Sequence, residues 1–290
     1  MKVCLQIGLV ASLSAGFLFG DASYTQVTKF TGGSAIDMAK KMADMPLIGR
    51  MGGGAMKNAF EDKRDEVYVK GNKMAHLGST FSTIYDLDAG TVTTINNTKQ
   101  TYTTMTFDEM REQMEKMQQR MNRNKSGGGE MQFDVKVEKT GETRTINGAS
   151  AKETLITMTA KQESANGQMV VKTHLWLVPQ TAATREVVDF SRKLGEKFAY
   201  AYGGGSPMMG PASGGLAAAM KESFKQDGYP VENDIEVSGV AMAGPMGGGG
   251  GDPSAPFMMM VMQSSNFATG AVDNAKFSVP AGYKEEKRRR

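Results

Sequence analysis

The stretch Met131-Gln-Phe133-Asp-Val135-Lys-Val137-Glu alternates apolar and polar side chains without interruption. Because successive side chains of a β-strand point to opposite faces, this period of two predicts a strand with one apolar face. Two more β-type segments, Lys152–Ala160 and Gln168–Val178, follow it, and Pro179 ends the second. This part of the chain therefore predicts consecutive strands of an antiparallel sheet.

Shorter β-type segments lie on either side, separated by turn residues such as Gly71-Asn72 and Asn96-Asn97. Those upstream are Tyr24–Phe30, Glu66–Lys70, Phe81–Leu87, Thr91–Ile95 and Thr101–Met105. Those downstream are Ile235–Met242, Phe257–Ser264 and Lys276–Val279. Short strands joined by turn residues predict an antiparallel meander.

Helical segments interrupt the strands at three or four places. One begins near Ser34, and a second begins at a capping box formed by Thr106 and Glu109 and runs to about Asn122. A third, at about 184–202, carries an apolar stripe that includes Val187, Phe190, Leu194 and Phe198, and a short fourth surrounds Met220. The combination predicts an α+β fold in which one long antiparallel sheet has helices packed on one face.

The first 22 residues have the layout of a secretory signal peptide. Lys2 provides a positive start, an apolar run follows to Phe19, and Gly20-Asp21-Ala22 offers small residues at the positions that precede a cleavage before Ser23. No later stretch approaches 18 apolar residues, so no transmembrane segment is expected in the mature chain. We therefore expect a periplasmic or secreted protein.

The rest of the chain divides into one domain and a tail. Residues 23–284 are expected to form a single domain, interrupted by Gly/Met/Pro-rich loops at 203–215 and 244–256. Residues 285–290 form a basic tail, which is either a solvated terminus or a contact to anionic lipid headgroups.

Composition excludes several classes of function. The net charge of +3 is too balanced for a dedicated nucleic-acid binder. One cysteine, which lies in the signal peptide, and two histidines exclude a disulfide scaffold and a Cys/His zinc site. The sequence has no Gly-x-Ser-x-Gly elbow and no Gly-Lys-Ser/Thr phosphate loop. We expect a non-enzymatic protein with no catalytic residues, no cofactor and no metal.

Methionine is abundant, with 24 residues. Met110, Met114, Met117 and Met121 are spaced to lie on one face of the capped helix. Such a face is either an apolar core face filled by adaptable side chains or, less favoured, a set of soft ligands for Cu(I). In the segment Met258–Met262, the even-numbered methionines share one strand face, while Met259 and Val261 share the other.

Several motifs resemble a bacterial exported family called domain of unknown function 4412. They are Val67–Met74 (VYVKGNKM), Ile84–Asp88 (IYDLD), Lys99–Tyr102 (KQTY), Thr145–Gly148 (TING) and Phe277–Lys284 (FSVPAGYK). That family is similar to the lipoprotein-carrier group (LolA/LolB/LppX-like), in which a curved antiparallel half-barrel holds helices or a lipid on its concave face. The resemblance implies a LolA-like half-barrel with helices on the concave face, and it carries no catalytic residues over to this chain.

Three functions follow as hypotheses. The first is binding of a lipid or another apolar ligand in the half-barrel, with Tyr85, Phe133, Trp176 and Phe190 as the candidate ligand-binding residues. The second is a structural or interaction module of the cell envelope, whose Met-rich loops contact a protein partner. The third, less favoured, is buffering of Cu(I) or oxidants by methionine.

Overall fold

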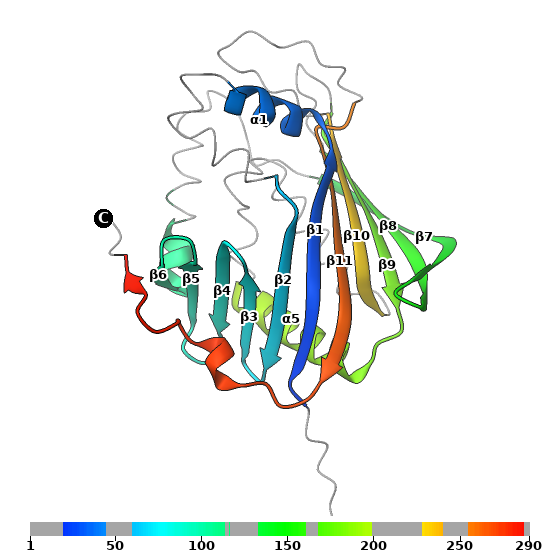
Figure 1. Ribbon diagram of the computed structural model, residues 1–290. Helices are drawn as coiled ribbons and strands as arrows, with labels where there is room; N and C mark the ends of the chain where they lie inside the picture. The colour runs from blue at the N-terminus through cyan, green and yellow to red at the C-terminus, as the bar shows by residue number, and fades with distance from the viewer. Residues whose placement is uncertain are drawn as a thin grey trace, which may run out of the picture.

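The structure, a computed structural model, describes residues 20–44, 60–113, 116, 133–160, 168–198, 228–239 and 255–286. Its described residues form one open sheet of twelve strands in the order β12-β6-β5-β4-β3-β2-β1-β11-β10-β9-β8-β7. The sheet is curved, and α5 lies across one side of it (Figure 1). A predominantly antiparallel α+β fold with a large curved sheet is thus confirmed.

The strand bounds are as follows. The first six strands are β1 (Ala22–Gly32), β2 (Lys63–Lys70), β3 (Lys73–Gly78), β4 (Phe81–Asp86), β5 (Thr91–Asn96) and β6 (Thr101–Thr106). The other six are β7 (Phe133–Ile146), β8 (Ala149–Ala160), β9 (Val170–Val178), β10 (Tyr229–Ser238), β11 (Met258–Thr269) and β12 (Lys284–Glu285).

The first strand, β1, lies in the middle of the sheet. From the central β1, the meander β2 to β6 reaches one edge, and β7 to β11 then return from the other edge to pair with β1. Neighbouring strands are antiparallel except β12, which pairs with β6 in parallel. Short turns suffice for this topology because antiparallel neighbours meet end to end.

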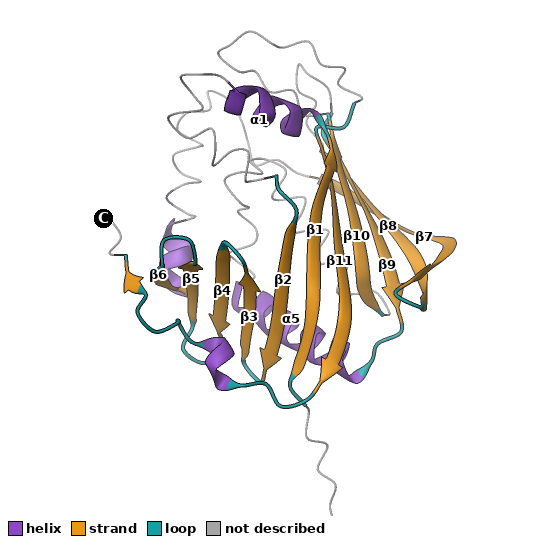
Figure 2. Cartoon of the chain, viewed as in Figure 1, coloured by secondary structure: helices purple, strands orange, loops and turns teal. Residues whose placement is uncertain are grey.

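Helices α1 and α5, which are labelled in Figure 2, and the 3-10 turn η3 accompany the sheet. Helix α1 (Ser34–Asp44) lies at one end of the strands, whereas α5 (Ala182–Phe198) contacts β1, β2 and β11. The hydroxyl of Thr181 accepts a hydrogen bond from the Thr184 amide at 3.3 Å, which caps the start of α5. The apolar stripe of α5 then buries Val187 and Phe190. The third helix is the 3-10 turn η3 (Asn274–Phe277).

Residues 270–286 cross the ends of several strands, and we call this segment the strap (Figure 1). Phe277, Val279 and Tyr283 of the strap pack against the buried residues Ala75, Ile84 and Ile95. At its end, the strap adds β12 to the edge strand β6. The strap therefore covers part of the sheet and pairs with the first two residues of the β6 edge.

The strap also holds the start of β1. The Asp21 carboxylate accepts a hydrogen bond from the Val272 amide at 2.8 Å and lies 3.5 Å from the Lys70 ammonium. Ala22 is buried and pairs with Val69 on one side and Thr269 on the other. Both residues precede the cleavage before Ser23 that the sequence predicts, and that cleavage stays a prediction.

Most predicted elements are confirmed, and two predictions need correction. The capping box is present, since the Glu109 amide donates to the Thr106 hydroxyl at 3.1 Å and the Thr106 amide donates to Glu109 at 2.9 Å. The strand expected at Lys276–Val279 is wrong, because the Asp273 side chain accepts from the Ala275 amide and starts η3 there. Strand β3 was not expected, although the Gly71-Asn72 turn precedes it.

Other predictions fall outside the described residues. They include nearly all of both Gly/Met/Pro-rich loops, most of the capped helix beyond Gln113, the short helix around Met220 and the last four residues of the tail. Within the described ranges, no helix has the length and apolar character needed to cross a membrane.

Candidate functional site

Three of the four predicted ligand-binding residues belong to one apolar cluster beneath α5. Trp176 and Phe190 are buried in it, and Tyr85 packs against it from β4. Phe190 is only 1% exposed, and Val187 from the same helix lies beside it. We call this group the α5 cluster. Helix α5 packs over this part of the sheet and buries Phe190 and Val187 against it.

The fourth residue, Phe133, belongs to a second apolar group. Its buried members are Ile156, Met158, Val171, Leu175, Leu177, Ile235, Val237 and Met258. Partly buried side chains pack around them, namely Phe30, Phe60, Phe133, Phe257, Met260 and Met262. We call this group the methionine cluster. It spans β1 and β7 to β11, and none of its members comes from α5.

Strand β11 confirms the predicted alternation of its methionines. Met258 and Met260 pair with Val237 and Ile235, which also belong to the methionine cluster. Met259 and Val261 pair with Glu236 and Asp234 and point to the opposite face. Strand β11 therefore offers apolar side chains to both of its faces.

A polar network lies on neighbouring strands, and sequence reasoning missed it. Arg144 of β7 forms ion pairs with Glu232 and Asp234 of β10, and its guanidinium carbon lies 3.8 Å from the centre of the Trp176 ring. Gln263 of β11 donates to Glu232 at 3.0 Å. These residues come from four strands, so no local sequence motif predicts the network.

Two carboxyl groups in this region, those of Glu232 and Glu153, have shifted pKa values. Burial and the nearby Asp234 raise the pKa of Glu232, and the opposing attraction of Arg144 does not cancel the rise. Burial acts in the same direction on Glu153, but hydrogen bonds from Thr140 (2.5 Å) and His174 (2.6 Å) outweigh it, so the pKa of Glu153 is lowered. Glu232 and Asp234 share the one guanidinium of Arg144, and these ion pairs tie β7 to β10.

The other histidine, His76, lies elsewhere on the sheet. Its Nε2 is 3.2 Å from the Met74 sulfur, and its ring meets Tyr85 edge-on at 6.2 Å between centroids. Burial lowers the pKa of His76 to about 4, so the imidazole is neutral at pH 7. The two histidines do not form one site.

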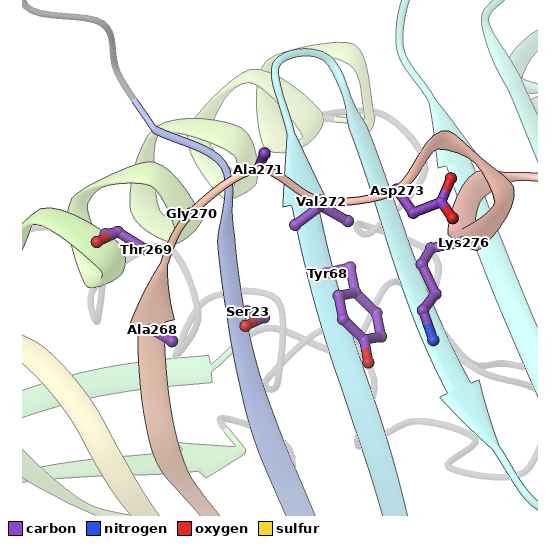
Figure 3. Close-up of a pocket in the computed structure, with 9 residues that line it drawn as sticks. All are labelled: Ser23, Tyr68, Ala268, Thr269, Gly270, Ala271, Val272, Asp273 and Lys276. Carbon is purple, nitrogen blue, oxygen red and sulfur yellow. The ribbon is translucent and has the colours of Figure 1, made fainter.

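Two shallow pockets have linings of mixed polar and apolar character. One, of about 260 Å³, lies beneath the strap, where Lys276 approaches the Tyr68 ring at 4.8 Å and Ser23 lies nearby (Figure 3). The other, of about 370 Å³, lies between α5 and the turns of the meander and is lined by Asn72, Asp88 and Lys193 among others. Pockets for small molecules usually measure about 300–1,000 Å³, so the first pocket is below this range and the second lies near its lower end.

The described residues include only part of the sequence on which the metal-binding interpretation rests. Among the described residues, no group of three or more His, Cys, Asp or Glu side chains could hold a metal ion. Of the four helix methionines, Met110 packs with Val92, Phe107 and Leu194, which is the apolar-core interpretation. Met114, Met117 and Met121 lie outside the described residues.

Comparison with known proteins gives no family. No family model and no curated protein matches the chain. Two crystal structures of PNGF-II, in space groups C2 and P21, align with 92% of this chain at TM-scores of 0.31 and 0.28 and identities of 10% and 7%. The chain spans about a third of the length of PNGF-II, 31% and 32% in the two alignments. The resemblance to domain of unknown function 4412 stays a prediction.

Proposed function

We propose that this protein is exported and is not an enzyme, and that it binds the acyl chain of a lipid against the methionine cluster. The layout of residues 1–22 supports export. The open, curved sheet supports a LolA-like half-barrel, the arrangement that the sequence resemblance implies.

The observation that carries the proposal is the extent of the methionine cluster. It reaches across β1 and β7 to β11 without any side chain from α5, whereas the α5 cluster is closed by that helix. Phe30, Phe133, Met260 and Met262 are only partly buried at its border. Flexible thioether side chains adapt to an irregular apolar ligand, as an acyl chain would require.

The energy available is large enough for stable binding. Burying one CH2 group contributes about 0.8 kcal/mol, so a sixteen-carbon chain would gain on the order of 10 kcal/mol. This gain exceeds the lower estimates of the cost of association, roughly 4 kcal/mol. A chain that is buried along most of its length would therefore be retained, and one that is only partly covered would gain proportionally less.

The proposal moves the candidate site away from three predicted residues. Tyr85, Trp176 and Phe190 support the sheet through the α5 cluster, and Phe133 is the one predicted residue that stays beside the proposed ligand. The Met260 and Met262 side chains replace the other three as binding residues.

Native mass spectrometry of the protein isolated from the exporting cell tests the proposal. We expect a stoichiometric adduct of lipid mass that organic extraction removes. The paired variant Met260→Gln/Met262→Gln should lose the adduct, whereas Met259→Gln, on the opposite face of β11, should keep it. A bare wild-type mass, or equal loss in both variants, would contradict the proposal.

A further inference from the structure

Strand β7 forms an open edge of the sheet. Within the described residues it pairs with β8 and with no strand on its other side (Figure 1). Its first seven residues, Phe133–Lys139, run in regular register against Ala160–Thr154, before a bulge interrupts the pairing. An edge strand exposes a row of backbone N–H and C=O groups, which is a template for pairing with another strand.

The side chains of this edge are unusual for an unprotected strand. Val135 is 38% exposed and Val137 is 37% exposed, although both belong to the alternation that predicts an apolar face. Lys136 lies between the two valines and Glu138 follows them. The charged groups of Lys136 and Glu138 are 2.8 Å apart. Over residues 133–139, two acidic and two basic side chains balance, so net charge does not oppose self-association.

We propose that two copies of the chain pair antiparallel through Phe133–Lys139, with Val135 opposite Val135 of the second copy. In this register, Phe133 lies opposite Val137, and Asp134 lies opposite Lys136, each twice by symmetry. Apolar pairs share one face and opposite charges share the other, and both kinds of cross-strand pair are stabilising.

Neighbouring registers are less favourable. A register centred on Lys136 places this ammonium against its own copy and Asp134 against Glu138, which are like charges. A register centred on Val137 places Phe133 opposite Gly141, beyond the start of the bulge between Lys139 and Thr143. Registers whose two-fold axis passes between two residues, for example between Val135 and Lys136, would place apolar side chains opposite charged ones.

The pairing would have two consequences. A two-fold axis through Val135 closes the assembly at two copies, because both open edges are used. Phe133 packs against the methionine cluster, so the clusters of both copies would become continuous across the axis. The pairing does not depend on lipid binding, since the register follows from β7 alone.

Charge reversal tests both the edge and the register. In sedimentation velocity of the purified protein from 1 to 200 µM, we expect the wild type to dimerise. Lys136→Asp and Asp134→Lys should each weaken the dimer roughly tenfold, because both symmetric charge pairs become repulsive. The double variant Asp134→Lys/Lys136→Asp should restore dimerisation. Lys172→Asp, an exposed charge reversal on the internal strand β9, is the matched control.

Three outcomes would overturn the proposal. They are a monomeric wild type at 200 µM, a dimer that the single variants leave unchanged, and a double variant that stays as weak as the singles. Far-UV circular dichroism establishes that each variant is folded, so that loss of the dimer is not loss of the fold. If Glu138→Lys, and not Asp134→Lys, restored the dimerisation that Lys136→Asp weakens, the register centred on Val135 would be refuted.

Discussion

Acidification should destabilise this fold in part through one imidazole, that of His76. The side chain lies on β3 opposite Val67, which is fully buried, and beside the Met74 sulfur. Burial disfavours the charged imidazolium and lowers its pKa from 6.5 to about 4. The folded state therefore binds the proton less tightly than the unfolded state does.

The sign and size of the effect follow from this difference. Between pH 6.5 and pH 4 the unfolded chain binds more protons at this group, so the free energy of unfolding falls as the pH falls. Above pH 6.5 the contribution is fully present. Because one pKa unit corresponds to 1.36 kcal/mol, the loss on reaching pH 4 is about 3 kcal/mol.

Urea unfolding at pH 7.0, 5.5 and 4.0 measures this loss. Carboxylates also titrate in this range, so the informative quantity is the difference between the wild type and His76→Leu, which cannot be protonated. We expect the wild type to lose about 3 kcal/mol more than His76→Leu. The His76 resonance in NMR should titrate near pH 4. Titration near 6.5, or equal losses in wild type and His76→Leu, would refute the reasoning.

Two further predictions concern packing and backbone conformation. Phe190→Ala should lower the free energy of unfolding by about 3–5 kcal/mol in urea unfolding, because the ring is 1% exposed beneath α5 and leaves a cavity; a loss below 1 kcal/mol would mean that α5 does not close the sheet. Gly239→Ala should cost more than the roughly 1–2 kcal/mol of a positive φ, since its Cβ would lie 2.0 Å from the Gln168 carbonyl oxygen; Gly141→Ala, also at positive φ but with open space around it, should cost only that strain. Equal melting temperatures for the two glycine variants would contradict the second prediction.

Local pattern was sufficient to predict most strands but not their place in the sheet. The alternation of Phe133, Val135 and Val137 correctly predicts a strand, and the same alternation would fit a strand with a fully covered face. Its position at the edge depends on the pairing of β11 with β1, which places β8 to β11 between β7 and β1 and which residues near β7 do not encode. The exposure of Val135 and Val137 is therefore a tertiary property.

The two errors in secondary structure have local causes. Strand β3 (KMAHLG) contains Lys, Ala and Gly, which have low β-propensity, and it is a strand because the turn at Gly71, with a φ of 57°, folds it onto β2. The segment around Lys276 has alternating apolar residues, yet the Asp273 cap starts a 3-10 turn. Phe277 and Val279 then pack within the strap without forming a strand.

The candidate site was the least predictable part. Aromatic residues were reasonable candidates because they bury large areas. However, the sequence pattern of an apolar position is the same whether a helix or a ligand covers it. Only the position of α5 separates Phe190 and Trp176, which are core, from Phe133 at the border of the methionine cluster. The Arg144 network joins residues up to 90 positions apart, which explains why no motif showed it.

The two edges of the sheet are treated differently, and this difference bears on function. At the β6 edge the chain adds β12 through the strap, whose Tyr283 and Phe277 pack against Ile95 and its neighbours. The longer β7 edge has no such cover among the described residues. Sheets normally protect their edges because open edges associate with other chains. A fold that covers one edge with its own segment and leaves β7 with balanced charges and two exposed valines has the features of a sheet that is completed by a second copy.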